Sequence, residues 1–182
     1  ISGFIRSYYA FGKKSRGTVY QLIDFFSLFY LQFMHKKNRD EHFWLNHIDS
    51  SVHRTWSGYT FELLALTHID AIKAALGISG VSTSVCSWRS SKNASATGSQ
   101  IDLLIDRNDN IINICEIKYS QGKFTIDKSY AQNLRNKIDT FIAETKTSKA
   151  IHLTMITTYG IVQNEYSSMV QSEITMDELF FN

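Results

Sequence analysis

The sequence lacks the residues and spacings that mark several common classes of site. It has only two cysteines, Cys86 and Cys115, whose separation is not that of a metal site, and we expect both to be buried, reduced thiols. Its six histidines show no zinc spacing, and they form no recognisable Ser-His-Asp or Cys-His arrangement. We therefore predict neither a zinc centre nor a nucleophilic triad.

Long apolar runs and a strong net charge are also absent. The most apolar stretch, residues 20–34, is short for a membrane span and contains Asp24 and Gln32, so we interpret it as a helix and expect no membrane contact. No signal peptide is visible, and we expect a cytoplasmic protein. The formal net charge is only +2, so any contact with nucleic acid must come from a local basic patch.

Length and composition indicate a folded protein with one medium domain and an appendage. The chain has 182 residues, and its apolar fraction of 43% is that of an ordinary globular protein. We divide the chain into residues 1–52 and residues 53–182. Because the chain opens on Ile1 rather than on methionine, we expect it to be the C-terminal part of a longer protein.

The first part reads as a hairpin followed by helices. Aromatic and β-branched residues at 3–9 and 18–23 predict two strands joined by a basic connection. Asp24 can cap a helix that runs to about residue 37 and is apolar nearly all round, so we expect this helix to lie between two layers. Residues 41–52 are predicted to add a short helix.

The second part alternates between helices and strands. Ser57 can cap a helix whose apolar stripe continues to Leu76, where Gly77 makes a helix stop, and Asp127 can cap a second helix. In order, we predict a helix at 57–76, a strand at 81–88, a polar loop at 89–99, a hairpin at 101–120, a helix at 127–144, a strand at 151–157 and a short helix at 176–181. This α-β-β-β-α-β order predicts an α/β fold with a mixed sheet flanked by helices.

The hairpin at residues 101–120 carries charges where apolar residues would be expected. Asp102 lies on its first strand, and Glu116 and Lys118 lie on its second. A carboxylate in a buried strand is costly unless it is paired or binds a cation. If the three groups converge, they would suit a divalent metal ion with a lysine beside it.

Convergence depends on the length of the turn within residues 106–110. A two-residue turn would place Asp102 and Glu116 on opposite faces, because side chains alternate along a strand. An odd-length connection or a bulge would place them on one face. The five turn-forming residues allow an odd length but do not prove it.

The pattern of an aspartate followed, after a turn, by Glu-x-Lys resembles the PD-(D/E)XK nuclease superfamily, whose restriction-endonuclease-like core has the element order given above. The resemblance implies that Asp102, Glu116 and the carbonyl of Ile117 bind Mg²⁺ or Mn²⁺. It also implies that Lys118 orients water or offsets charge on the scissile phosphate. A further carboxylate is often found on the first helix of this superfamily, and Glu62 occupies the matching place.

A wider set of strings resembles the C-terminal region of a family of prokaryotic AAA-type ATPases, in which a winged helix and a nuclease-like domain follow the nucleotide module. The strings include SGFIRSYYAFGKK, WSGYTFELL, ICEIKYS and LTMITTYG. The resemblance implies that residues 1–23 are the wing of a truncated winged helix. No P-loop string occurs in this chain, so the ATP-binding module would lie upstream.

Several polar residues near this predicted site are possible contacts to a DNA backbone. The wing would offer Lys13, Lys14 and Arg16, the polar loop would offer Arg89 and Lys92, and the edge of the second long helix would offer Asn133 and Lys137. Each also has a simpler explanation as a solvated turn, a flexible connection or an exposed helix edge.

The functional interpretation therefore has alternatives. Taken singly, Glu116 and Lys118 could be charges on a half-exposed strand, Asp102 a cap at the start of a strand, and Glu62 a solvated helix residue. The first hypothesis is a metal-dependent DNA nuclease attached to an ATPase. The second is a catalytically silent module that binds nucleic acid or protein and regulates that ATPase. The third is a defence-associated effector that acts on RNA. A homo-oligomer is compatible with each.

Overall fold

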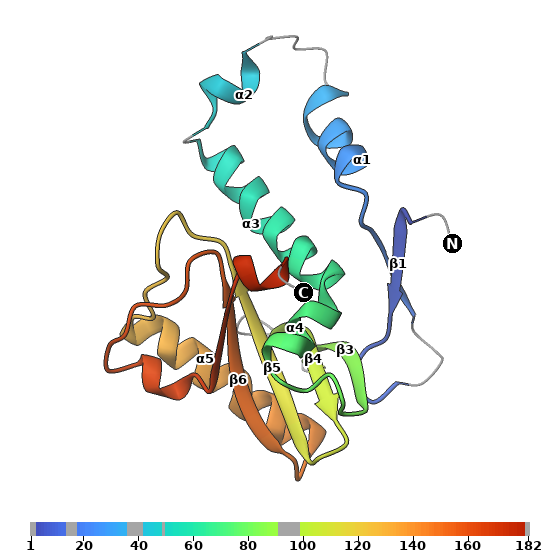
Figure 1. Cartoon of the computed structure of the whole chain (residues 1–182), viewed down its shortest axis with the longest axis vertical. Coiled ribbons are helices and arrows are strands. Elements are labelled where there is room, and N and C mark those ends of the chain that lie inside the picture. Colours follow the sequence, from blue (N-terminus) through green and yellow to red (C-terminus); the bar gives the residue numbers. More distant parts are fainter. Residues whose placement is uncertain (1–2, 14–17, 36–41, 49, 91–98, 181–182) are drawn as a thin grey trace.

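The computed structural model describes residues 3–13, 18–35, 42–48, 50–90 and 99–180. Lys14, Arg16 and Lys92, three of the predicted phosphate contacts, lie outside the described residues. The core is a five-stranded mixed sheet in the order β3-β4-β5-β6-β7, flanked by helices (Figure 1). The strands are β3 (Thr83–Arg89), β4 (Gln100–Arg107), β5 (Ile111–Lys118), β6 (Ala150–Thr157) and β7 (Ser172–Thr175).

Strand directions follow from the lengths of the connections. β4 pairs antiparallel with both β3 and β5, and only three residues join β4 to β5. β5 and β6 are parallel and joined through α5 (Lys128–Thr145). β7 continues the parallel pairing at the far edge. The predicted mixed sheet is confirmed. We did not predict β7, because a strand of four residues gives little periodic signal.

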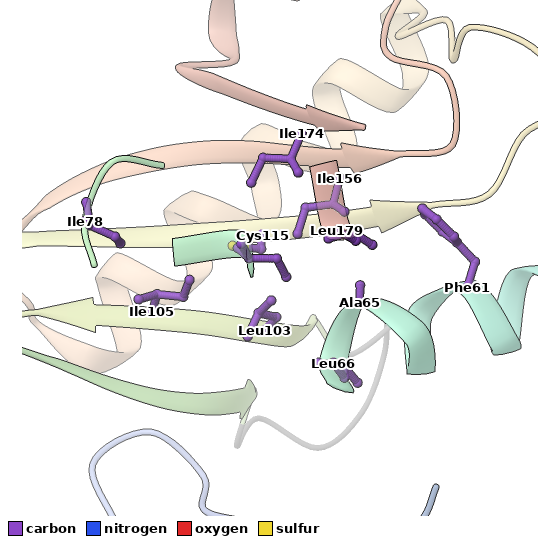
Figure 2. Packing of buried hydrophobic residues seen from close by; sticks show 11 residues of the cluster. Phe61, Ala65, Leu66, Ile78, Leu103, Ile105, Cys115, Ile156, Ile174 and Leu179 are labelled. Atoms are coloured by element: carbon purple, nitrogen blue, oxygen red, sulfur yellow. The ribbon is translucent and has the colours of Figure 1, made fainter. Parts of the chain in front are cut away.

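One face of the sheet is covered by α3 (Ser51–Thr67) and α4 (Ile69–Ala75). Figure 2 shows Phe61, Ala65 and Leu66 of α3 lying against side chains of the sheet. The buried members of this cluster from the sheet are Leu103 and Ile105 of β4, Cys115 of β5, Ile156 of β6 and Ile174 of β7. Cys115 is buried, as predicted, and so is Cys86 on β3.

The opposite face is covered by α5. Its buried Leu134 and Phe141 pack against Leu104, Ile114 and Leu153 of the three central strands. Because β4 and β5 are covered on both faces, they consist largely of apolar residues, and a charged residue at their ends has to find partners. The two short helices η2 (Ser167–Met169) and η3 (Asp177–Leu179) flank β7 along the chain.

Helix ends agree with the sequence in most places. Asp24 and Asp127 cap their helices as predicted, each accepting a bond from the backbone N–H three residues later. Gly77 has a φ of 68°, and Ile78 N–H donates to Lys73 O over 2.9 Å, so the predicted stop at Gly77 is confirmed. The single helix predicted at 57–76 was wrong, because α3 ends at Thr67 and α4 begins at Ile69. The cap of α3 is Ser50, however, and the prediction of Ser57 was wrong. α3 therefore begins before the position at which we divided the chain.

The N-terminal part begins with the predicted antiparallel hairpin, β1 (Ile5–Tyr8) and β2 (Val19–Leu22). The chain after β1 is bonded to the sheet, because Phe11 N–H donates to Ser87 O over 2.8 Å. The Phe11 ring lies 5.2 Å from the ring of Phe141, edge to face. These contacts fix the hairpin beside β3.

The helical segment after the hairpin is less enclosed than we predicted. It consists of α1 (Phe25–Phe29) and the π-helical η1 (Tyr30–Met34), and none of its residues is buried. Phe29 and Phe33 pack edge to face against Trp56 of α3 and Trp44 of the short helix α2 (Phe43–Asn46), but Phe26 is 70% exposed. The expectation of two covering layers was wrong, because this segment packs through one side only. Among the described residues, no helix is long and apolar enough to cross a membrane.

Candidate functional site

The hairpin of β4 and β5 has the odd-length connection that the site requires. Three residues, 108–110, join the strands, and Asn110 has a φ of 65°. A three-residue turn ending in a left-handed residue is a common hairpin link, and asparagine tolerates that conformation well. The resulting register pairs Leu103 with Cys115 and Leu104 with Ile114.

Where β4 pairs with β3, a bulge at Asp102 interrupts the register. Cys86 pairs with Leu104 and Trp88 with Ile101, so Ser87 alone faces both Asp102 and Leu103. In a regular strand the two neighbours of a residue lie on one face, but Ile101 packs toward α5 and Leu103 toward α3. Bulges often redirect a side chain beside a functional site. The alternation of side chains along β4 is therefore regular up to Leu103, and it does not determine the face on which Asp102 lies.

Glu116 is the most enclosed of the predicted site residues, with 9% of its surface exposed. Tyr130 Oη donates to its Oε1 over 2.8 Å, and Lys137 Nζ to its Oε2 over 2.6 Å. Lys118 Nζ lies 3.3 Å from Oε1. Burial alone would raise the pKa of Glu116, but Lys137, Lys118 and these hydrogen bonds outweigh burial and lower the pKa below its ordinary value. Glu116 is therefore held as a carboxylate.

Glu62 lies on α3, beside the buried Phe61, and lines a cavity together with Asp102. Burial raises the pKa of Glu62 to about 7, and the negative charge of Asp102 adds to this effect. Lys118 lowers the pKa, Glu116 raises it and Arg6 lowers it, in decreasing order of effect. Glu62 thus lies within electrostatic range of all three predicted residues of the hairpin.

The oxygen atoms of these carboxylates are the kind of ligand that Mg²⁺ prefers. Among the described residues, however, no three histidine, cysteine, aspartate or glutamate side chains form a group that could hold a metal ion as they stand. Glu116 is occupied by Lys137 and Tyr130, and Asp102 Oδ1 accepts a hydrogen bond from Gln100 Nε2. The donor chemistry fits a magnesium ion, but these side chains would have to rearrange to bind one.

The predicted phosphate contacts have different surroundings. Lys137 is bonded to Glu116, so it belongs to the site, whereas Asn133 is exposed one turn earlier on α5. Arg89 Nη2 donates to Gln100 Oε1 over 2.5 Å and lines the cavity of Glu62 and Asp102. Lys13 is exposed at the end of the first described segment. Ile117 contributes its side chain to the cluster beneath α3, and the role of its carbonyl stays a prediction.

Five polar residues of the cavity were not predicted from the sequence. They are Arg6, Tyr8, Gln21, Ser87 and Gln100. The first three lie on the hairpin, which is remote in sequence from Asp102. Only the polar residues in β1 and β2 could have indicated that one face of this hairpin is accessible to solvent.

Comparison of the chain with family models, with curated proteins and with solved structures found no match.

Proposed function

We propose that this chain is a nuclease-like domain of the PD-(D/E)XK superfamily, with a restriction-endonuclease-like fold, and that it hydrolyses phosphodiester bonds of DNA with Mg²⁺ or Mn²⁺. The observation that carries the proposal is the position of Glu62, which shares a cavity with Asp102 and lies within electrostatic range of Glu116 and Lys118. The sheet, with its three antiparallel strands followed by a crossover through α5, supports the proposal independently.

Asp102, Glu116 and the carbonyl of Ile117 would hold the ion, and the chemistry supplied there would be neutralisation of phosphate charge and a lower pKa of a water molecule. Lys118 Nζ would orient that water or offset charge on the scissile phosphate. Glu62, whose pKa is about 7, can accept a proton at its carboxylate near neutral pH, which suits a general base. Tyr130 and Lys137 would position Glu116 through the two bonds described above.

We also propose that residues 1–23 are the wing of a winged helix and that an AAA-type ATPase module precedes it in the full protein. The support for the wing is the antiparallel hairpin of β1 and β2, which forms a two-stranded sheet of its own beside β3. The ATPase module rests on the resemblance of the sequence alone. The nuclease domain would then act as the DNA-processing part of a cytoplasmic ATPase.

One observation favours a second function, a catalytically silent module that binds nucleic acid or protein. Both oxygens of Glu116 already have cationic or hydroxyl partners in the protein, an arrangement that stabilises the fold without a metal ion. In this alternative, the charged cluster would be a structural ion-pair network.

A cleavage assay separates the two functions. The chain is incubated with labelled DNA, and with RNA of the same sequence, in Mg²⁺, in Mn²⁺ and in EDTA. Metal-dependent cleavage that is lost in Asp102→Ala and lowered in Glu62→Gln, but kept in Asp139→Asn on the exposed side of α5, supports the nuclease. Cleavage of DNA at the wild-type rate by Glu62→Gln would remove Glu62 from the site. No cleavage in any metal, together with no rise in melting temperature on adding metal, would favour the silent module.

A further inference from the structure

The cavity that contains Glu62 and Asp102 extends well beyond these two carboxylates. Its volume is about 370 Å³, near the lower end of the range of about 300–1,000 Å³ that small ligands occupy. A cavity of this size can enclose one nucleotide unit but not the width of a duplex.

Three separate elements form its walls. The hairpin contributes Arg6, Tyr8 and Gln21, α3 contributes Glu62 and Leu66, and the edge of the sheet contributes residues of β3 and β4. The hairpin is held in this position by Arg6, whose Nη1 donates to Leu66 O over 3.0 Å. The wall opposite α3 is therefore tied to α3 by a direct bond.

The cationic side chains of the cavity are preorganised. The Arg6 guanidinium lies over the Tyr8 ring, with its Cζ 4.8 Å from the ring centre. Arg89 donates to Gln100, and Gln100 donates to Asp102, so a chain of bonds links a cation to the predicted metal ligand. Two guanidinium groups thus balance the two carboxylates of the cavity.

The remaining lining matches the chemistry of a base. The amide of Gln21 can donate and accept hydrogen bonds, whereas that of Gln100 is bonded to Arg89 and Asp102. Val19, Leu66 and Trp88 supply apolar surface. Proteins that recognise unpaired nucleotides combine such apolar or aromatic walls with amide groups and with arginine for the phosphate.

We propose that this cavity binds one unpaired nucleotide of the strand that is to be cut, with Arg6 and Arg89 on its phosphate and Gln21 on its base. The inference rests on the proposed function, because it makes the cavity the substrate site next to Glu62 and Asp102. It specifies that the substrate is single-stranded DNA, or the unpaired end of a duplex, rather than a continuous duplex.

The test measures the binding of a short fluorescein-labelled single strand by fluorescence anisotropy in EDTA, with a blunt duplex of the same sequence for comparison. We expect the single strand to bind about tenfold more tightly than the duplex. Arg89→Ala and Gln21→Ala should each weaken single-strand binding by about three- to tenfold, the effect of losing a hydrogen bond to a charged or polar ligand group. Arg135→Ala, an arginine on the exposed side of α5, is the matched control and should bind as the wild type does.

Melting temperatures show whether each variant is folded. Arg6→Lys is a further variant, which keeps the positive charge but loses the paired N–H donors of the guanidinium group. Equal affinity for strand and duplex, or unchanged affinity in Arg89→Ala and Gln21→Ala, would overturn the inference. If the wild type then still cleaves DNA and Glu62→Gln cleaves it more slowly, the cavity inference fails but the proposed nuclease function stands. If the cavity variants weaken single-strand binding while no metal supports cleavage, the cavity inference stands and the nuclease proposal fails.

Discussion

Replacing Glu62 by glutamine tests the electrostatics of the site through the stability of the fold. The substitution keeps the size of the side chain and removes its ionisation. Because the pKa of Glu62 is raised from 4.5 to about 7 in the folded chain, the unfolded chain loses this proton more readily. Ionised Glu62 therefore destabilises the fold, and Glu62→Gln should stabilise the protein wherever Glu62 is ionised.

The size of the effect follows from the same pKa difference. At 1.36 kcal/mol per pKa unit, a change from 4.5 to about 7 corresponds to about 3.4 kcal/mol for a group without access to water. Glu62 is only half-buried, and solvent screens its charge, so we expect about 1–2 kcal/mol. The difference should be absent below about pH 4.5, where both states hold the proton, should grow between pH 4.5 and about 7, and should be complete above about pH 7.

Urea denaturation followed by circular dichroism at several pH values measures this difference directly. In a chain of this size, 1 kcal/mol corresponds to about 2–4 °C in melting temperature, so thermal denaturation gives a second reading. Asp139→Asn removes an exposed carboxylate of α5 and should change stability little at any pH. A Glu62→Gln variant that is less stable than the wild type at about pH 8, or an advantage that persists unchanged in acid, would refute the reasoning.

Further predictions concern the rest of the site and the fold. Lys137→Met removes the ammonium group 2.6 Å from Glu116 and should cost about 1–2 kcal/mol near neutral pH, less than a fully unpaired buried charge because Lys118 and Tyr130 still contact Glu116. Since the pKa of Glu116 is lowered, the wild-type advantage should fade as the pH falls below about 4.5, which urea denaturation in acid would detect. Gly77→Ala should cost about 1 kcal/mol by chemical denaturation, because φ is 68° while the space for a Cβ is open, and no cost would mean that the helix end has shifted. Mg²⁺ should raise the melting temperature of the wild type but not of Asp102→Ala, and an equal rise in both would exclude Asp102 as a ligand.

Features fixed by local chemistry were predictable from the sequence. Asp127 precedes an apolar stripe and Gly77 follows one, so the ends of those helices could be placed from a few residues. The start of α3 could not be placed in this way, because Ser50 and Ser57 are equally good caps. The turn between them packs on α1 through Trp56 and on α2 through His53, contacts that the local sequence does not reveal. The one-sided packing of α1 could not be inferred from its composition, since an apolar helix indicates that it needs packing partners but not how many sides they cover.

In the site, too, the features set by local sequence were predictable and those set by remote pairing were not. The odd-length turn could be argued from residues 106–110, and Lys137 could be placed on the inner edge of α5 by its angle from the apolar stripe. The bulge at Asp102 could not be predicted, because it depends on how β4 pairs with β3. Arg6 and Gln21 were missed for a related reason, since their relevance arises only from the docking of a remote hairpin beside the sheet.

The attachment of residues 9–11 to Ser87 restricts how copies of this protein could assemble. Phe11 N–H donates to Ser87 O, and Ser87 N–H donates to Tyr9 O, so the outer backbone groups at this point of β3 are already taken. A neighbouring chain that adds a strand at this edge would first have to displace the hairpin. The opposite edge is β7, with four residues. Strand addition at Ser172–Thr175 would leave the hairpin and the cavity behind it undisturbed.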